Sequence, residues 1–426
     1  MKTIIKGGRV IDPKNNLDQC LDVLIEEDRI KEIAPQIREQ ADQVIDASNK
    51  IVAPGLIDLH VHLREPGRED KETILSGTRA AAKGGFTTVL AMPNCEPAID
   101  SPEKVRSLNQ RIKKDARVNV LVSSAITLER AGQKITDLDS LQKEGVLAIT
   151  DDGSSVEDSK IMLNAMQRAK ELDLLVIAHC EDVFLSKKGV VNKGFTSTKL
   201  GLKGISRESE YSRVARDIEL AEKSNARLHI AHVSCRESVE MVAKAKKRGL
   251  RVSAETAPHY FALDEEAAWS FDTNMKMNPP LRAKEDAESI RQALAEGVID
   301  VIASDHAPHT INEKAIEFDR AAFGVIGLET ELAVAITELV NKKILTLFDL
   351  IKKFTVNPAS IIKIDKGALS PAAVADLVIF SPEKEWVVKK ENLVSKSSNS
   401  CFLGKRIKGV VEYTFCQGQM VYARQD

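Results

Sequence analysis

Eight short apolar runs, separated by stretches with mostly helical patterning, constrain the fold of this 426-residue chain more than any other feature. They lie at 57–61, 87–91, 118–123, 146–150, 174–178, 227–231, 251–255 and 299–303. Apolar and β-branched runs of this length are typical of buried strands. Strand–helix–strand units make right-handed parallel crossovers, so eight of them favour an α/β fold with a closed, TIM-like (β/α)8 barrel. An open doubly wound sheet is the alternative, but no GxGxxG follows the first strand to support it.

The two ends of the chain have a different sequence pattern from the middle. Short strands bounded by turn residues are predicted at 3–5, 22–25, 29–33 and 43–46, and again at 376–380, 386–388 and 410–422. Neither end alone can bury much apolar surface. We therefore predict that residues 1–53 and 366–426 pair into one small β-sandwich domain, with the barrel of residues 54–365 inserted between them.

Side chains suited to binding a metal follow several of the predicted barrel strands. His60, His62 and Arg64 alternate along one strand and should point the same way. Two imidazoles placed in this way form half of a site for a transition metal such as zinc. A lone histidine at a strand end is more often an ordinary hydrogen-bonded residue. Because the C-terminal ends of barrel strands share one rim, six ligand types there favour a metal centre: His60, His62, Asp152, His179, His232 and Asp305.

The two aspartates of that set suggest separate roles. Two zinc ions about 3.5–4 Å apart need a bridging anion, and Asp152 is central enough to supply one. Its neighbour Asp151 should face the other way and cap a turn. Asp305 could bind one ion and keep an oxygen free to handle a proton. Zinc also lowers the pKa of bound water toward 7, so the pattern predicts one or two zinc ions per chain and hydrolytic chemistry.

Composition excludes several other classes of function. The formal net charge is -2, which gives no electrostatic footprint for nucleic acid or for an anionic membrane. No run approaches the roughly 20 apolar residues that a spanning helix needs, and the N-terminus shows no signal-peptide pattern. The six cysteines are scattered without a CxxC, as expected for reduced thiols. We predict a cytoplasmic protein that acts on a small molecule.

Several further residues could belong to the site. His229 lies inside a strand and should face away from the barrel axis, where packing is the expected role. His259 is expected to support the site or the fold, and His306 and Cys180 should point away from their ligand neighbours. His309 lies on a loop, where polar side chains are more often functional. We also expect mobile loops at 187–203 and at 310–324, the second closing over bound substrate.

The sequence resembles the amidohydrolase superfamily and, within it, dihydroorotases of the long bacterial type. The resemblance covers nearly the whole chain and rests on the segments PGLIDLHVHLREPG, AMPN, TDDG, AHCE, HIAHVS, ETAPHY, MNPPLR, SDHAPH and FGVIGLET. It implies that His60 and His62 bind one zinc, that His179 and His232 bind the second, and that Asp152 bridges them. It also implies that Asp305 binds the first zinc and is the catalytic acid/base. The substrate-binding residues implied are Arg64, Asn94, Asn278, His309, Phe323 and Gly324.

The resemblance implies reversible cyclisation of N-carbamoyl-L-aspartate to L-dihydroorotate, a step of pyrimidine biosynthesis. It also implies a homo-oligomer, and a complex with aspartate transcarbamoylase is a further option. A hydantoinase or allantoinase is one alternative, but these relatives usually bridge their metals with a carboxylated lysine where this chain has Thr150-Asp151-Asp152. A non-catalytic scaffold for aspartate transcarbamoylase is the other. Scaffold chains tend to lose ligands, whereas this chain keeps all six.

Overall fold

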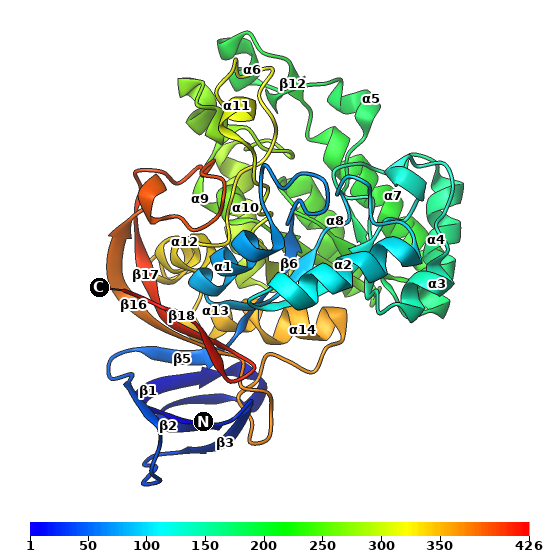
Figure 1. The fold of residues 1–426 in the computed structure, drawn as a ribbon. Helices are drawn as coiled ribbons and strands as arrows, with labels where there is room; N and C mark the ends of the chain where they lie inside the picture. Colours follow the sequence, from blue (N-terminus) through cyan, green and yellow to red (C-terminus); the bar gives the residue numbers. More distant parts are fainter. Residues whose placement is uncertain (426) are drawn as a thin grey trace.

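The structure is a computed structural model that describes residues 1–425, and it is built around one barrel of parallel strands (Figure 1). Eight strands follow one another around the barrel in chain order, each paired in parallel with the next. They are β6 (Leu56–Val61), β7 (Phe86–Ala91), β8 (Asn119–Ser124), β9 (Ala148–Ile149), β10 (Leu175–Ala178), β13 (Arg227–Ile230), β14 (Val252–Thr256) and β15 (Val301–Ile302). The ring closes where His62 N donates to His306 O at 2.9 Å. The predicted fold class is confirmed, and every predicted barrel strand coincides with an observed one.

Helices cover the outside of the barrel. The stretches with helical patterning between the barrel strands form α1 (Ile74–Gly84), α2 (Pro102–Asp115), α3 (Leu138–Lys143), α4 (Ser159–Glu171), α7 (Glu208–Ser224), α8 (Arg236–Lys247) and α10 (Lys284–Ala295). Their ends follow from local chemistry. Thr73 and Ser76 form a capping box at the start of α1, and Gly85 ends it at φ 88°. Ser101 caps α2, and Pro102 occupies its first turn, where a missing N–H costs nothing.

Six further helices and two short strands lie in segments that had no predicted element. They are α5 (Val183–Ser186), α6 (Phe195–Leu200), α9 (Pro258–Ala262), α11 (Ile311–Lys314), α12 (Glu331–Ala335) and α14 (Val356–Ile362), with β11 (Val191–Asn192) and β12 (Gly204–Ile205). A seventh, α13 (Leu347–Phe354), packs under the barrel. Residues 187–203 are therefore not a plain loop. They hold β11 and α6, and Arg282 Nη1 donates to Asn192 Oδ1 at 3.1 Å to anchor them.

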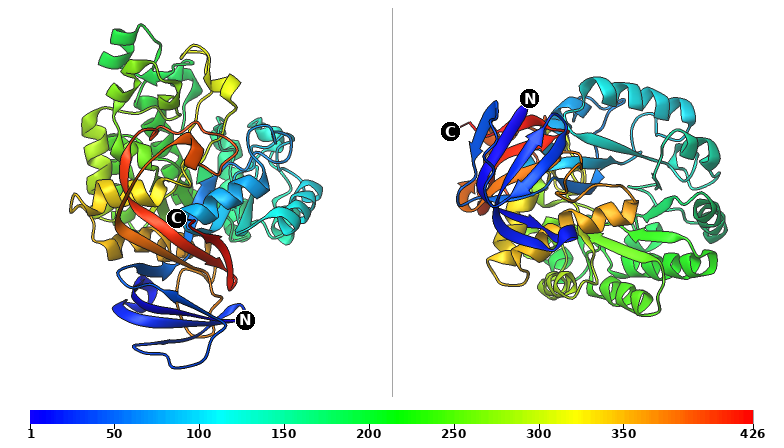
Figure 2. Two further views of the ribbon diagram at one scale, coloured as in Figure 1. Left: turned by 60° about the vertical axis from the view of Figure 1, so that its left-hand side comes forward. Right: turned by 90° about the horizontal axis from the view of Figure 1, so that it is seen from below.

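Both ends of the chain contribute to a second, mixed sheet. Its strands are β1 (Lys2–Asp12), β2 (Leu17–Glu26), β3 (Arg29–Ala34), β4 (Gln43–Asp46), β5 (Ile51–Pro54), β16 (Leu377–Val387), β17 (Arg406–Cys416) and β18 (Gln419–Ala423). Their order is β18-β17-β16-β5-β1-β2-β3, with β4 beside β1. The antiparallel pairing of β5 with β16 joins the two ends, and Figure 2 shows the blue N-terminal strands and the orange to red C-terminal strands in one sheet. The domain boundaries given above stay a prediction.

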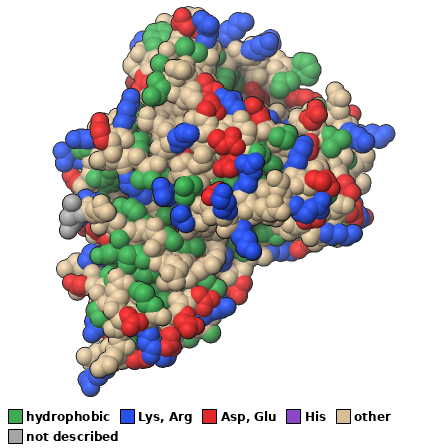
Figure 3. Space-filling view, viewed as in Figure 1, with side chains coloured by type: hydrophobic (Ala, Val, Ile, Leu, Met, Phe, Trp, Pro, Cys, Tyr) green, Lys and Arg blue, Asp and Glu red, His purple; other side chains and the backbone are tan. Residues whose placement is uncertain are grey.

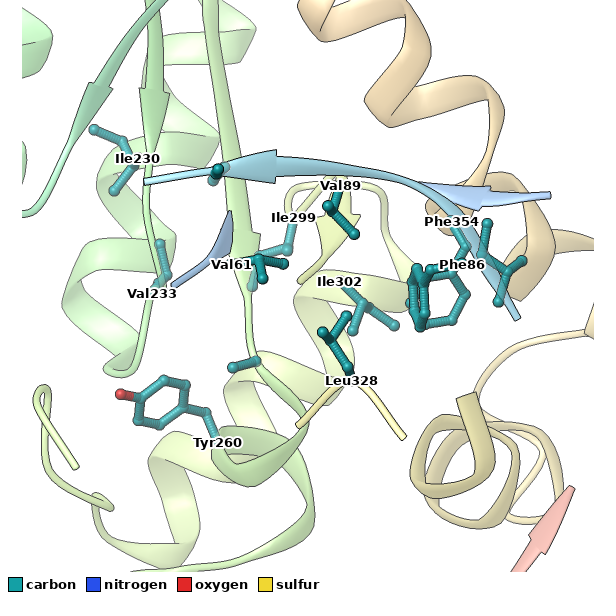
Figure 4. Packing of buried hydrophobic residues seen from close by; sticks show 14 of the residues in the cluster. Val61, Phe86, Val89, Ile230, Val233, Tyr260, Ile299, Ile302, Leu328 and Phe354 are labelled. Atoms are coloured by element: carbon teal, nitrogen blue, oxygen red, sulfur yellow. The ribbon is translucent and has the colours of Figure 1, made fainter. Parts of the chain in front are cut away.

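A continuous apolar core joins the barrel to its helices (Figure 4). Phe86 on β7 meets Phe354 on α13 edge to face, with ring centroids 5.9 Å apart, a geometry that aromatic pairs favour. Val89, Ile302 and Leu328 belong to the same buried cluster. This packing holds the strands rigidly, so the side chains at their C-terminal ends are presented from a fixed frame.

Many charged side chains lie on the surface, whereas the histidines lie inside the protein. Basic and acidic side chains are interspersed over the face shown in Figure 3, and no histidine is visible there. All 8 histidines of the chain are buried. Among the described residues, no helix combines the length and the apolar character that crossing a membrane requires. The polar chemistry of the imidazoles is therefore concentrated inside the protein.

Candidate metal centre and active site

The six predicted metal ligands meet at one rim of the barrel. His60 lies on β6 and His62 just beyond it, while each of the others lies within three residues of the end of β9, β10, β13 or β15. All six are buried: His60, His62, Asp152, His179, His232 and Asp305. Convergence at the C-terminal rim is the arrangement expected for a barrel active site.

Asp152 lies at the centre of this cluster. Its Oδ1 is 3.2 Å from His60 Nε2, 3.7 Å from His179 Nδ1 and 3.7 Å from His232 Nε2. Its Oδ2 is 3.5 Å from His62 Nε2. One carboxylate thus faces all four imidazoles with its two oxygens, which is the placement that bridging two cations requires.

Three of the four imidazoles turn one ring nitrogen to this cluster and contact a partner with the other. His62 Nδ1 lies 2.7 Å from Asn94 Oδ1, which leaves Nε2 facing the aspartates. His179 uses the opposite atoms: Nδ1 faces the cluster, and Nε2 lies 3.3 Å from Glu181 Oε2. Outer hydrogen bonds of this kind fix the tautomer and orientation of metal-binding histidines.

The donor set fits a metal ion. His60 Nε2 and Asp152 Oδ1 are both fully buried and, although close together, have no hydrogen-bond partner among the described residues. Buried polar atoms are normally paired, so orphans that face one another indicate a missing shared ligand. Two overlapping groups have ligand atoms within 4.8 Å of one another: His60, Asp152 and His232, and His60, His62 and Asp305. Imidazoles and carboxylates are the ligands that zinc accepts.

Asp305 is placed to handle a proton as well as a cation. Its Oδ1 lies 3.2 Å from His62 Nε2 and 3.7 Å from His60 Nε2. An aspartate carboxyl has an unperturbed pKa of about 4. The carboxyl group is therefore ionised at neutral pH and can accept a proton from a reacting group.

A cavity of about 240 Å³ opens over this cluster. All the predicted site residues except His60, which lies behind Asp152, line it, together with Gly153 and Ala307. The predicted substrate-binding residues on its wall are Arg64, Asn94, Asn278, His309, Phe323 and Gly324. A cavity this small, with polar groups on several sides, suits a compact polar molecule rather than a polymer.

Cationic groups gather on one side of the cavity. Arg64 Nε donates to Pro308 O at 3.2 Å. Lys71 Nζ lies 3.3 Å from His309 Nδ1, and His309 Nε2 lies 2.7 Å from Phe323 O. Burial and the charges of Arg64 and Lys71 lower the pKa of His309 to about 3. His309 is therefore neutral, with Nε2–H donating to Phe323 O and Nδ1 accepting from Lys71 Nζ.

Backbone strain is also concentrated at the site. Arg64, His232 and Asp305 have φ of 61°, 34° and 46°, in the left-handed region that side chains with a Cβ avoid. Such conformations persist where the surroundings enforce them, and they cluster at functional sites. Here they turn side chains at strand ends toward the common cavity.

The remaining candidate residues lie outside the ligand cluster. Asp151 accepts from Ile126 N and Thr127 N and so caps a turn, as expected. Cys180 and His306 point away from the cluster, toward Asp217 and Glu72 respectively, and His259 is buried beside Tyr260.

The prediction for His229 was wrong. His229 is not a packing residue, because its Nε2 lies 3.0 Å from Glu255 Oε2, and Glu255 Oε1 in turn lies 2.6 Å from His60 Nδ1. A polar residue inside an apolar strand is the sequence signal that could have marked His229 and Glu255. The same reasoning missed Glu181, whose Oε2 also accepts from Asn278 Nδ2 at 2.8 Å.

Comparison with known proteins decides the family. A dihydroorotase of Elusimicrobium minutum (strain Pei191) is 48% identical over 420 residues, covering 99% of this chain and 97% of the relative. The chain belongs to the dihydroorotase family. A dihydroorotase of Geotalea daltonii is 47% identical over the full length of both chains. The family model described as dihydro-orotase-like matches residues 49–238, which hold five of the six ligand positions.

The chain shares its fold with solved hydantoinase structures. The L-hydantoinase (dihydropyrimidinase) of Arthrobacter aurescens superimposes with a TM-score of 0.90 at 22% identity, covering 100% of this chain and 96% of that one. A D-hydantoinase superimposes with a TM-score of 0.87 at 26% identity, over 99% of this chain and 95% of that one. The barrel with a terminal β domain is therefore shared, while the closer sequence relatives are dihydroorotases.

Proposed function

We propose that this chain is a zinc-dependent dihydroorotase that interconverts N-carbamoyl-L-aspartate and L-dihydroorotate in pyrimidine biosynthesis. The observation that carries the proposal is the single cavity that brings the ligand cluster, Asp305 and Arg64 together. The full-length relatives named dihydroorotase support the same reading.

Different residues of the chain have separate roles in the reaction. In the hydrolytic direction, water adds to the ring amide carbonyl, and the ring C–N bond breaks. Asp305 accepts a proton from the attacking water and delivers it to the leaving nitrogen. Zinc, when bound by the histidines and aspartates, supplies Lewis acidity and makes water a better nucleophile at neutral pH. Asp152 holds the two halves of the ligand set together.

Recognition of the substrate carboxylate separates this reaction from that of a neutral cyclic amide. Arg64 offers a charged fork on the cavity wall, and an arginine–carboxylate pair is directional as well as strong. Asn94 accepts from His62 through Oδ1, so its Nδ2 donor is left for a ligand. We assign Arg64, Asn94 and His309 to the carboxylate, and Asn278, Phe323 and Gly324 to the rest of the ring.

The proposal is tested by assaying the zinc-reconstituted protein with L-dihydroorotate, hydantoin and dihydrouracil side by side. Hydrolysis of dihydroorotate with the highest kcat/KM is expected, because only this substrate carries a carboxylate for Arg64. A preference for either uncharged ring would favour the hydantoinase alternative instead. No turnover of any ring by zinc-loaded protein would favour the scaffold alternative.

Metal content is expected to be one or two zinc ions per chain, and Asp152→Ala is expected to lower it. The substitution removes the carboxylate that faces all four imidazoles, so their mutual positions lose a common ligand. Elemental analysis of protein purified without chelator, and again after adding zinc and desalting, measures this. Parent protein that holds no transition metal in either preparation would contradict the prediction.

The segment 310–324 is expected to gain protection from hydrogen exchange when substrate binds. Lys314 Nζ donates to Ala322 O at 2.9 Å and to Gly324 O at 3.0 Å, and His309 holds Phe323 O. A substrate that recruits His309 must compete with that last bond, so loop and ligand are coupled. Exchange with and without dihydroorotate is compared, with α2 as the internal reference. Equal protection of residues 310–324 in both states would refute the coupling.

The homo-oligomer, the cytoplasmic location and the complex with aspartate transcarbamoylase stay predictions from the sequence.

A further inference from the structure

We propose that Glu255, backed by His229, is a positioning residue that holds His60 with its Nε2 atom turned to the metal. This inference rests on the metal dependence in the proposed function. It deepens that function by assigning roles to two residues on strands β14 and β13, neither of which lines the cavity.

The contacts form one unbroken chain inside the barrel wall. His60 Nδ1 lies 2.6 Å from Glu255 Oε1, and Glu255 Oε2 lies 3.0 Å from His229 Nε2. His229 Nδ1 then lies 2.8 Å from Ser253 Oγ. His60 and His229 are 0% exposed and Glu255 is 1% exposed, so water does not compete for these bonds.

The partners determine which atoms carry protons. A carboxylate only accepts hydrogen bonds, so both imidazoles must donate to Glu255. His60 therefore carries a proton on Nδ1, and its Nε2 faces Asp152 and Asp305. His229 donates to Glu255 through Nε2, and its Nδ1 pairs with the hydroxyl of Ser253. With Nδ1 held by Glu255, Nε2 is the ring nitrogen of His60 that is left to bind a cation.

The register of the strands builds this arrangement into the fold. His229 on β13 lies directly opposite Ser253 on β14, so the terminal contact is fixed by strand pairing. Glu255 follows Ser253 by two residues and therefore lies on the same face of β14. His62, by contrast, is held by the neutral amide of Asn94. His60 has the stronger, charge-assisted partner, which also raises the basicity of its free nitrogen.

The proposed hydrogen-bond series from His60 through Glu255 to His229 is tested by measuring the zinc affinity of Glu255→Gln by competition with a chromophoric chelator. Glutamine keeps the shape but lacks the charge, and its amide nitrogen cannot accept from His229. We expect zinc binding to weaken about 10- to 100-fold. We also expect loss of the downfield proton NMR signal of the His60 Nδ1–H bond and a changed visible spectrum of the cobalt-substituted protein.

Two further variants separate positioning from general stability. Glu329→Gln is the matched control, because Glu329 is also a buried glutamate but accepts from the backbone of Val394 and Ser395. It should leave zinc affinity and the cobalt spectrum unchanged. His229→Gln should weaken zinc binding severalfold, and it should add nothing in the Glu255→Gln background, because His229 acts only through Glu255.

Unchanged zinc affinity in Glu255→Gln would overturn the proposal, and so would additive losses in the double variant. If Glu255→Gln does not fold, the zinc affinity of His229→Gln decides the question. A parent-like zinc affinity in His229→Gln would contradict the support of His60 by Glu255 and His229. Turnover of dihydroorotate by the parent is measured on the same preparations. A parent that binds zinc without hydrolysing dihydroorotate would refute the proposed function and leave the role of Glu255 intact.

Discussion

Asp305→Asn is expected to bind dihydroorotate and zinc yet lose kcat by about 10³-fold, within the range that a positioned acid/base contributes. The amide keeps a carbonyl oxygen that can face the metal, and it fills the same volume. It cannot accept the proton of the attacking water. Steady-state kinetics, zinc content and dihydroorotate binding, all on one preparation, separate the loss of proton transfer from a loss of metal.

Asp300→Asn provides a matched control at the opposite end of the same strand. Asp300 precedes β15 and accepts from Lys246 Nζ and from Ala254 N through Oδ2, contacts that an amide oxygen can still accept. Its kcat should stay close to the parent value. If Asp305→Asn retained near-parental kcat with full metal content, another group would be moving the proton, and the acid/base assignment would be wrong.

The barrel could be predicted from local sequence because each strand is a compact apolar run between polar segments. Such runs remain recognisable when the pairing partner is far away in the chain. Short helices such as α5, α6 and α11 were not predicted, since a helix of four to six residues shows less than two turns of periodicity. Helix α6, for example, is held by Trp269 Nε1, which donates to Thr196 Oγ1 at 3.0 Å, a contact that no local window contains.

Some features of the site could likewise be predicted from the sequence, and others could not. Its six candidate metal ligands could be predicted because each lies at or within three residues of a strand end, where barrel geometry brings side chains together. The contact of Glu255 with His60 could not, because it spans 195 positions of sequence. The left-handed backbone at His232 and Asp305 could not be predicted either, because histidine and aspartate adopt this conformation only occasionally.

Arg64→Ala is expected to retain zinc and lower kcat/KM for dihydroorotate by about 10²-fold or more, since losing one partner of a buried charged pair typically costs several kcal/mol. Arg64 cannot ligate a metal, so its removal should act on substrate alone. The internal control is dihydrouracil, which lacks the carboxylate. Any turnover of that ring should change far less, so the preference between the two substrates should collapse. If Arg64→Ala left kcat/KM for dihydroorotate unchanged, the carboxylate would be bound elsewhere in the cavity. The main physical reason for preferring dihydroorotate over a neutral ring would then be gone.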